Sequence, residues 1–187
     1  MNNFNHPSAS RSGQLNENIG FGAGGLVGEV RRPGMSYRIR LTWENGRLWG
    51  RLGGAVFGEN LHLETHGNQI LGSVASSSRV LSLHGQQEAG RLEYRLVGGR
   101  NLSGWLELRG NGLAGRVYAE EQSYGFSAVQ GGASIAQIGD DSEAQQIVLE
   151  SNPLPPLVLG AALLAADVAS REAWRALLNS YQGIAEG

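Results

Sequence analysis

Six arginines near the start of the chain have the chemistry to bind anions. The set comprises Arg31, Arg32, Arg38, Arg40, Arg47 and Arg51, and Glu44 is the only acid between residues 31 and 51. A guanidinium fork matches phosphate and carboxylate groups. If adjacent strands carry them, Arg38, Arg40, Arg47 and Arg51 share one outer face. This predicts a patch for an anionic lipid head group, an anionic membrane surface or an acidic partner. The alternative is an ordinary charged face that pairs with acids of the C-terminal part.

Three residues in alternation, His62, Glu64 and His66, are the types that bind metal ions. Alternate residues of a strand point to the same side, so the three side chains would converge. Leu61 and Leu63 take the buried face, which leaves the three in solvent. We therefore interpret them as a solvated strand face that runs into a turn at His66-Gly67, and we expect no metal and no cofactor.

Two further motifs lack the context that their chemistry requires. Gly20-x-Gly22-x-x-Gly25 matches a dinucleotide fingerprint, but a polar arm precedes it and a strand follows, so we expect a flexible loop. Asp140-Asp141-x-Glu143 is better explained as an acidic loop or helix cap than as a cation site. The chain also has no Gly-x-Ser-x-Gly elbow and no nucleophile with a recognisable base. We expect a non-enzymatic protein.

A motif of apolar-x-Gly-x-apolar residues repeats along the chain about every 22 residues. Copies start at residues 26, 48, 70, 92 and 113, and the fourth copy lacks the glycine. Alternating apolar and polar segments lie between them, at residues 37–43, 61–64, 80–84 and 105–109. Strict alternation is typical of strands with one buried face. With a further segment at residues 124–129 and weaker ones at residues 133–138 and 146–150, the pattern predicts about 12 strands. A helical turn is the alternative near residues 142–145.

Two Asn-Gly pairs, Asn45-Gly46 and Asn111-Gly112, separate neighbouring strand segments. Asn-Gly favours the type I′ turn of a tight hairpin, so the strands are predicted to be antiparallel. A parallel solenoid with a 22-residue coil is the competing interpretation.

An apolar helix is predicted over residues 156–182, after three prolines at positions 153, 155 and 156. Up to Ala169 it is apolar on all sides, which is typical of a fully buried helix, and its apolar run is too short to span a bilayer. Beyond Ser170 the pattern becomes one-sided, with apolar positions at Trp174, Leu177, Leu178 and Tyr181.

The recurring glycines point inward with their apolar neighbours, at Gly28, Gly50, Gly72 and Gly115. Glycine inside a strand commonly marks the close approach of another backbone, so we expect the sheet to surround the helix. Bulges that bend the strands are the alternative. The fold prediction is an antiparallel barrel or strongly curved sheet around a C-terminal helix. Residues 1–18 are predicted to be a disordered arm, and residues 19–187 a single domain.

Composition narrows the classes of function. The 187 residues include 29 glycines, no cysteine and no lysine, and the net charge of −2 argues against a nucleic-acid binder. Residues 1–116 hold 13 arginines and 8 acids, whereas residues 117–187 hold 2 arginines and 9 acids. No secretory signal is visible, so a cytoplasmic location is expected.

The run Leu157-Val-Leu-Gly-Ala-Ala-Leu-Leu-Ala-Ala-Asp167, together with about a dozen antiparallel strands, resembles the tubby C-terminal-like superfamily. This superfamily includes the LURP-one-related and phospholipid-scramblase-like proteins, and the resemblance covers roughly residues 20–170. It implies a non-enzymatic module, since some members bind phosphoinositides or other lipids.

Three functions follow as hypotheses. The first is a module that binds an anionic lipid or acidic partner through the arginines. The second is a structural subunit, oligomeric or bound to another protein, which contacts another chain through Trp49, Trp105, Trp174 or Tyr181. The third is a metal-dependent enzyme at His62, Glu64 and His66.

Overall fold

Twelve strands and one helix form the part of the chain that the structure describes. A computed structural model describes residues 24–32, 35–54, 58–98, 101–119, 123–129, 134–138, 145–151 and 154–185. The predicted N-terminal arm lies outside these residues, as do Gly20, Gly22 and the acidic motif at residues 140–143.

The elements follow one another with short connections. They are β1 (Gly24–Arg32), β2 (Met35–Glu44), β3 (Arg47–Gly53), β4 (Gly58–His66), β5 (Gln69–Ala75), β6 (Val80–Glu88), β7 (Arg91–Val97), β8 (Leu102–Arg109), β9 (Gly112–Tyr118), β10 (Ser123–Val129), β11 (Ser134–Ile138), β12 (Gln145–Ser151) and α1 (Pro156–Ala185).

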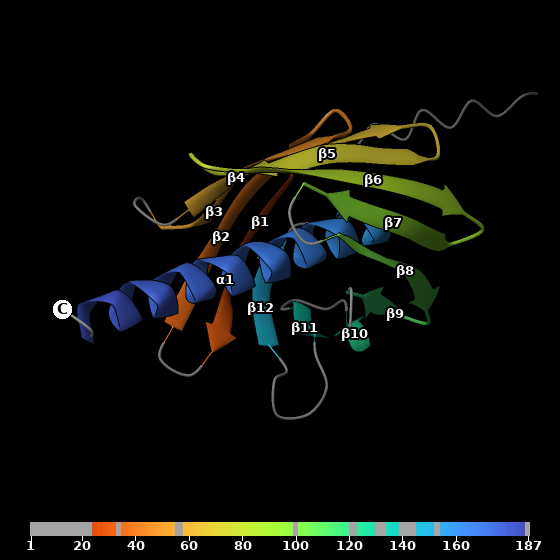
Figure 1. Ribbon diagram of the computed structural model, residues 1–187. Coiled ribbons are helices and arrows are strands. Elements are labelled where there is room, and N and C mark those ends of the chain that lie inside the picture. Colours follow the sequence, from red (N-terminus) through yellow and green to blue (C-terminus); the bar gives the residue numbers. More distant parts are fainter. Residues whose placement is uncertain are drawn as a thin grey trace, which may run out of the picture.

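The strands curve around α1 in one antiparallel sheet (Figure 1). Each strand pairs with its neighbours in the chain, and β1 pairs with both β2 and β12, so the hydrogen bonds close the sheet into a barrel. This confirms the predicted antiparallel barrel or strongly curved sheet of about 12 strands. It excludes the parallel solenoid, because all the pairings are antiparallel.

One of the two predicted hairpin turns is displaced by a residue. Asn45 and Gly46 have φ angles of 51° and 78°, as the predicted type I′ turn requires. In the other hairpin Arg109 pairs with Gly112, so the turn residues are Gly110 and Asn111, and only Gly110 has a positive φ. A glycine at the first central position suits a type II′ turn, which leaves Gly112 free to begin β9.

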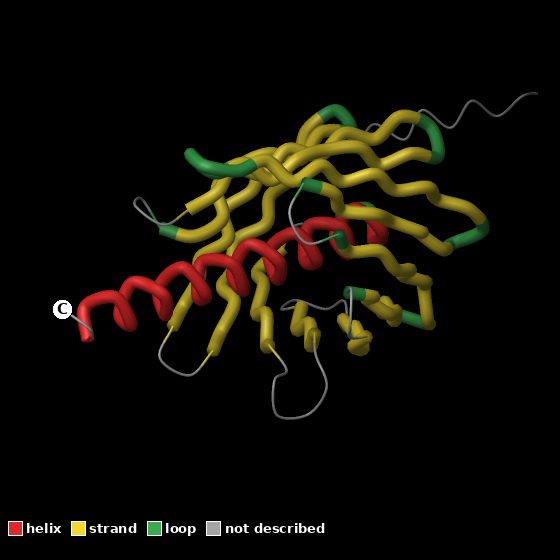
Figure 2. Tube along the Cα trace, viewed as in Figure 1, coloured by secondary structure: helices red, strands yellow, loops and turns green. Residues whose placement is uncertain are grey.

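The barrel has two different ends. Four two-residue turns lie at one, the hairpin end: Asn45-Gly46, Gly67-Asn68, Ala89-Gly90 and Gly110-Asn111. Helix α1 follows β12 at this end and runs through the barrel to the opposite one, the exit end. There the C-terminal part of the helix extends beyond the strands (Figure 2).

Helix α1 is the centre of the hydrophobic core. Every residue from 157 to 170 is buried, so the predicted burial of the apolar half is confirmed. Gly160 lies against the barrel wall, where an added Cβ would be 2.6 Å from Leu106 Cδ1 on β8. The helix ends at Ala185, three residues beyond the predicted boundary.

At three of the four inward glycines the adjacent strand occupies the space that a side chain would need, and the sheet surrounds the helix as predicted. A Cβ at Gly50, Gly72 or Gly115 would lie 2.1, 2.1 or 2.2 Å from a carbonyl oxygen of the adjacent strand. At Gly72 it would also lie 2.5 Å from Leu63 Cδ2. The missing side chains therefore allow strands to coil closely past each other, which is the role of glycine at a tight bend.

Candidate functional site

The first three strands carry the predicted arginines on the outer face of the barrel. Arg38 and Arg40 are exposed and alternate with the buried Tyr37, Ile39 and Leu41 on β2. Arg31 lies on β1, and Arg47 and Arg51 lie on β3. Arg32 ends β1, and its side chain lies outside the described residues. As the alternation predicts, Arg38, Arg40, Arg47 and Arg51 share one face, which we call the arginine face.

Two acids outside the span of the arginines neutralise part of this face. Arg31 forms an ion pair with Glu29, and Ser36 Oγ donates a hydrogen bond of 2.7 Å to the same carboxylate. These two hydrogen bonds, from Ser36 first and Arg31 second, lower the pKa of Glu29. Arg47 Nε lies 3.0 Å from Glu64 Oε1 on β4. The flanks of the arginine face are thus paired.

The middle of the arginine face is more positive. Arg40 lies directly opposite Arg51 in the β2–β3 register. Arg51 donates to Asn60 Oδ1 at 3.1 Å and to the Gly54 carbonyl at 3.2 Å. Arg40 forms no ion pair with any described residue. A hollow of about 310 Å³ beside it is lined by Arg31, Arg38 and Arg40 and also by the acid Glu29.

Of the three residues considered as metal ligands, both histidines contact Glu64 on the outer face of β4. His62 Nε2 lies 3.4 Å from Glu64 Oε1, and His66 Nε2 lies 3.0 Å from Glu64 Oε2. The hydrogen bond from His66 is the main reason why the pKa of Glu64 is lowered. Within the described ranges, no group of three or more His, Cys, Asp or Glu side chains has an arrangement that could hold a metal ion.

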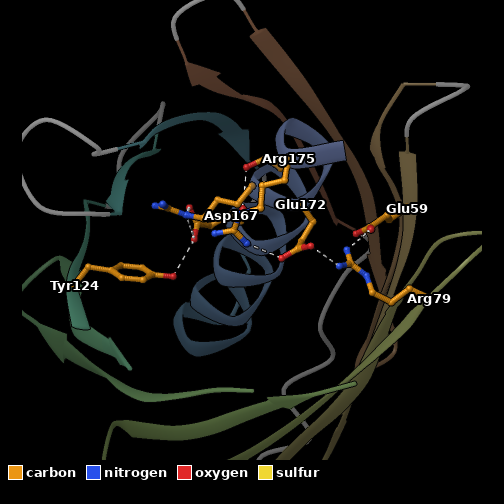
Figure 3. A network of polar contacts seen from close by, with 8 residues as sticks. Glu59, Arg79, Tyr124, Asp167, Glu172 and Arg175 are labelled. Atoms are coloured by element: carbon orange, nitrogen blue, oxygen red, sulfur yellow. Dashed lines mark hydrogen bonds and ion pairs between the residues drawn. The ribbon is translucent and has the colours of Figure 1, made fainter. Parts of the chain in front are cut away.

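At the exit end, a chain of ion pairs joins α1 to the barrel (Figure 3). Arg79, just before β6, contacts Glu59 Oε1 of β4 and Glu172 Oε2 of α1, each at 2.8 Å. Glu172 also contacts Arg175 at 2.8 Å. Burial acts to lower the pKa of Arg79, but the hydrogen bonds to Glu59 and Glu172 outweigh it and raise the pKa. One arginine before β6 thus bridges β4 and the helix.

A second cluster surrounds the fully buried carboxylate of Asp167. Arg171 Nε donates to Asp167 Oδ1 at 2.9 Å and to Oδ2 at 3.0 Å, and Tyr124 Oη donates to Oδ2 at 3.4 Å. The guanidinium of Arg171 also lies 5.0 Å from the centre of the Tyr124 ring. Burial, and then the charge of Asp167, raise the pKa of Tyr124. These contacts compensate a charge inside the apolar core.

Sequence reasoning missed the functions of these exit-end residues in positioning the helix. It treated Asp167 only as the end of an apolar run, although a lone acid between Ala166 and Val168 was a signal for a buried ion pair. Arg79 and Glu172 are 93 residues apart, and no local pattern connects them.

The aromatic interaction candidates are dispersed. Trp49 is 37% exposed on the outer face of β3, and Trp105 lies on β8 beneath the guanidinium of Arg91, 4.8 Å from the ring centre. Trp174 is half-buried on the C-terminal half of α1, one turn before Leu178, which is 44% exposed. The side chain of Tyr181 lies outside the described residues.

Among the described residues, no helix is long and apolar enough to cross a membrane. Comparisons with protein-family models, with curated proteins and with solved structures found no match.

Proposed function

We propose that the protein is a non-enzymatic binding module that holds an anionic group on its arginine face. The interior is filled by α1, whose residues 157–170 are all buried, so the outer surface is where a ligand meets the protein. One observation carries the proposal: Arg40 and Arg51 lie directly opposite each other. Like charges at facing positions destabilise a sheet, and a phosphate or carboxylate between them removes that repulsion.

The anionic lipid head group is the ligand class that we favour. Anionic lipids are concentrated in the cytoplasmic leaflet, so the proposal places the protein in the cytoplasm. A barrel around a buried helix is also what the resemblance to the tubby C-terminal-like superfamily leads us to expect, and membership of that superfamily is part of the proposal.

Vesicle sedimentation tests this function. At about 0.15 M salt, the protein should sediment with phosphatidylserine-containing vesicles and stay in solution with phosphatidylcholine vesicles. The double variant Arg40→Gln, Arg51→Gln should lose roughly 2 kcal/mol of membrane affinity, since each arginine near the surface contributes about 1 kcal/mol. The double variant Arg109→Gln, Arg116→Gln removes the same charge from another part of the barrel and should bind normally.

Two results would distinguish a lipid head group from a free phosphate compound as the source of the anion. Equal sedimentation with both vesicle types would contradict lipid binding. If inositol hexakisphosphate nevertheless protects the wild type against thermal unfolding, and the Arg40→Gln, Arg51→Gln variant loses that protection, the arginine face binds a free phosphate compound.

A second candidate function is assembly with another chain, and the exposed Leu178 favours it. This residue and the half-buried Trp174 belong to the C-terminal half of α1. Light scattering should then detect a mass above that of the monomer, and Leu178→Glu should restore the monomer. A strict monomer for the wild type would argue against assembly between copies.

A further inference from the structure

A hollow of about 500 Å³ lies on the outer face of strands β5–β9. Its side-chain lining includes His84, Glu93, Arg95, Ser103, Trp105 and Tyr118. We call it the outer hollow. Gly85 and Gly104 also line it, and the side chain of Tyr94 between them is buried in the core. The outer hollow is distinct from the arginine face, which belongs to β2 and β3.

The register brings the polar residues of the outer hollow into one row. His84 lies opposite Arg95, Arg95 opposite Ser103, and Ser103 opposite Tyr118. Because facing side chains are about 5 Å apart, the row presents a guanidinium flanked by an imidazole and a hydroxyl. A ligand that contacts all four must therefore span roughly 15 Å.

Arg95 is the arginine of the outer hollow that remains available to a ligand. Its neighbour Arg91 lies over the ring of Trp105 and contacts Glu93 at 3.2 Å. Arg95 is exposed and forms no ion pair with any described residue. The fork of an arginine can accept both oxygens of a carboxylate in a bidentate contact.

Aromatic rings and hydroxyl-binding groups surround this cation. Tyr118 is 44% exposed at one end of the row, and Trp105 is half-buried beside it. The faces of such rings pack against C–H groups, while Ser103, His84 and the carboxylate of Glu93 can hydrogen-bond to hydroxyls. Glu93 would also repel a ligand with closely spaced negative charges. The lining therefore favours a ligand with many hydroxyls and no more than one negative charge on each ring.

We propose that the outer hollow binds a sugar that carries a carboxylate. The carboxylate lies on the guanidinium of Arg95, the hydroxyls bond to Ser103, His84 and Glu93, and the face of the ring packs on Tyr118. The hollow is open to solvent, which suits a polar ligand that stays partly hydrated. This inference does not depend on the anionic function of the arginine face.

Titration of the full isotope-labelled chain with digalacturonate tests the proposal by nuclear magnetic resonance. Backbone amides of Arg95, Ser103 and Tyr118 should shift, and the neutral disaccharide of galactose should bind more weakly. Arg95→Gln should weaken digalacturonate binding about tenfold, which is the usual effect of losing one charge-assisted hydrogen bond. Tyr118→Ala should weaken both sugars, and Arg109→Gln, a charge loss outside the hollow, should weaken neither. Both Arg95 and Tyr118 are exposed, so unchanged melting temperatures should show that the variants fold.

Four outcomes would overturn the proposal. The first is the absence of shifts in the hollow with either sugar. The second is equal affinity for the acidic and neutral sugars, and the third is shifts confined to Arg38, Arg40 and Arg51, which would place the acid on the arginine face. The fourth is tighter binding of a single-stranded DNA oligomer at the same amides, which would assign the hollow to nucleic acid.

Discussion

At Gly72 the missing side chain decides how closely two strands can pass. The His62 carbonyl and the Leu63 side chain of β4 occupy the space that a Cβ would need. The φ of Gly72 is not in the left-handed region, so the requirement for glycine there is one of space. This separates it from Gly46, whose positive φ is a requirement of the turn.

Gly72→Ala should therefore destabilise the protein by about 1–3 kcal/mol, the usual cost of overfilling a packed site. Gly54→Ala is the matched control, because nothing lies within 4 Å of an added Cβ there. Its free energy of unfolding should change by less than about 0.5 kcal/mol. Urea denaturation of the two variants compares them, and equal stabilities would contradict the close-approach explanation.

Tyr37 allows a test of how a buried hydroxyl without a hydrogen bond affects stability, and of how stability depends on pH. Its hydroxyl is buried without a hydrogen-bond partner among the described residues, and burial, followed by the charge of Glu59, raises its pKa. A raised folded-state pKa means that stability is complete below the unfolded-state value of about 10 and falls as the pH rises above it.

Tyr37→Phe should leave the free energy of unfolding at pH 7 unchanged or raise it by up to about 1 kcal/mol, because no hydrogen bond is lost. It should also reduce the loss of stability above about pH 10, where the unfolded tyrosine ionises. Denaturation curves at pH 7 and in this alkaline range measure both effects. The exposed Tyr118→Phe serves as the control. A large destabilisation by Tyr37→Phe at pH 7 would show that the hydroxyl is well satisfied.

The sequence predicts that Tyr37 and Gly72 face inward, but it does not predict what each residue contacts there. Period-two alternation correctly placed Tyr37 and Gly72 on the inner face, because a strand alternates its side chains whatever it pairs with. That Gly72 lies against Leu63 depends on how sharply β4 and β5 coil, which no local pattern encodes.

Among the elements, α1 is fixed by charge as well as by burial. Its apolar half fills the barrel, and Asp167 and Glu172 attach it to Tyr124 and Arg79 near the exit end. Apolar contacts alone are non-directional, so these polar contacts set the depth and rotation of the helix.

Arg171→Ala should destabilise the protein by about 3 kcal/mol, since it removes the cation nearest a fully buried carboxylate. Arg175→Ala removes an exposed arginine one turn further on and should cost no more than about 0.5 kcal/mol. In the double variant Arg171→Ala, Asp167→Asn, part of the lost free energy of unfolding should be recovered. If the double variant is no more stable than Arg171→Ala, the ion pair does not account for the effect.

The helix itself was predictable from the sequence, whereas its attachments were not. Alanine and leucine on every side of residues 157–169 indicate a buried helix in any fold. The partner of Glu172 is 93 residues away, so the pair can be recognised only once the fold of the barrel is known.

For the molecule as a whole, barrel and helix share one hydrophobic core. Trp43 on β2, Leu106 on β8 and Leu163 on α1 are all buried within it. The twelve antiparallel pairings leave no strand with an open edge, so neither the barrel nor the helix has a second core of its own.

Thermal unfolding should therefore be a single transition. Far-ultraviolet circular dichroism reports the loss of helix and strand, and near-ultraviolet circular dichroism reports the packing of buried aromatic rings. The two curves should coincide, as they do for a two-state domain. A separate earlier loss of helix signal would contradict the shared core.

The repeat of about 22 residues correctly indicated hairpins, and Asn45-Gly46 correctly indicated that they are antiparallel. Closure through β1 and β12 was beyond the sequence, since it joins strands from opposite ends of the described chain. The outer hollow was missed for the same reason, because its lining comes from five strands.

The position of α1 after all twelve strands has a consequence for synthesis. Strands leave the ribosome before the helix that covers their inner faces, so the nascent chain exposes leucine-rich surfaces while translation continues. Unpaired strands with such faces are prone to aggregate and are substrates for chaperones. In the cell, the nascent barrel therefore depends on protection until its own helix has been translated.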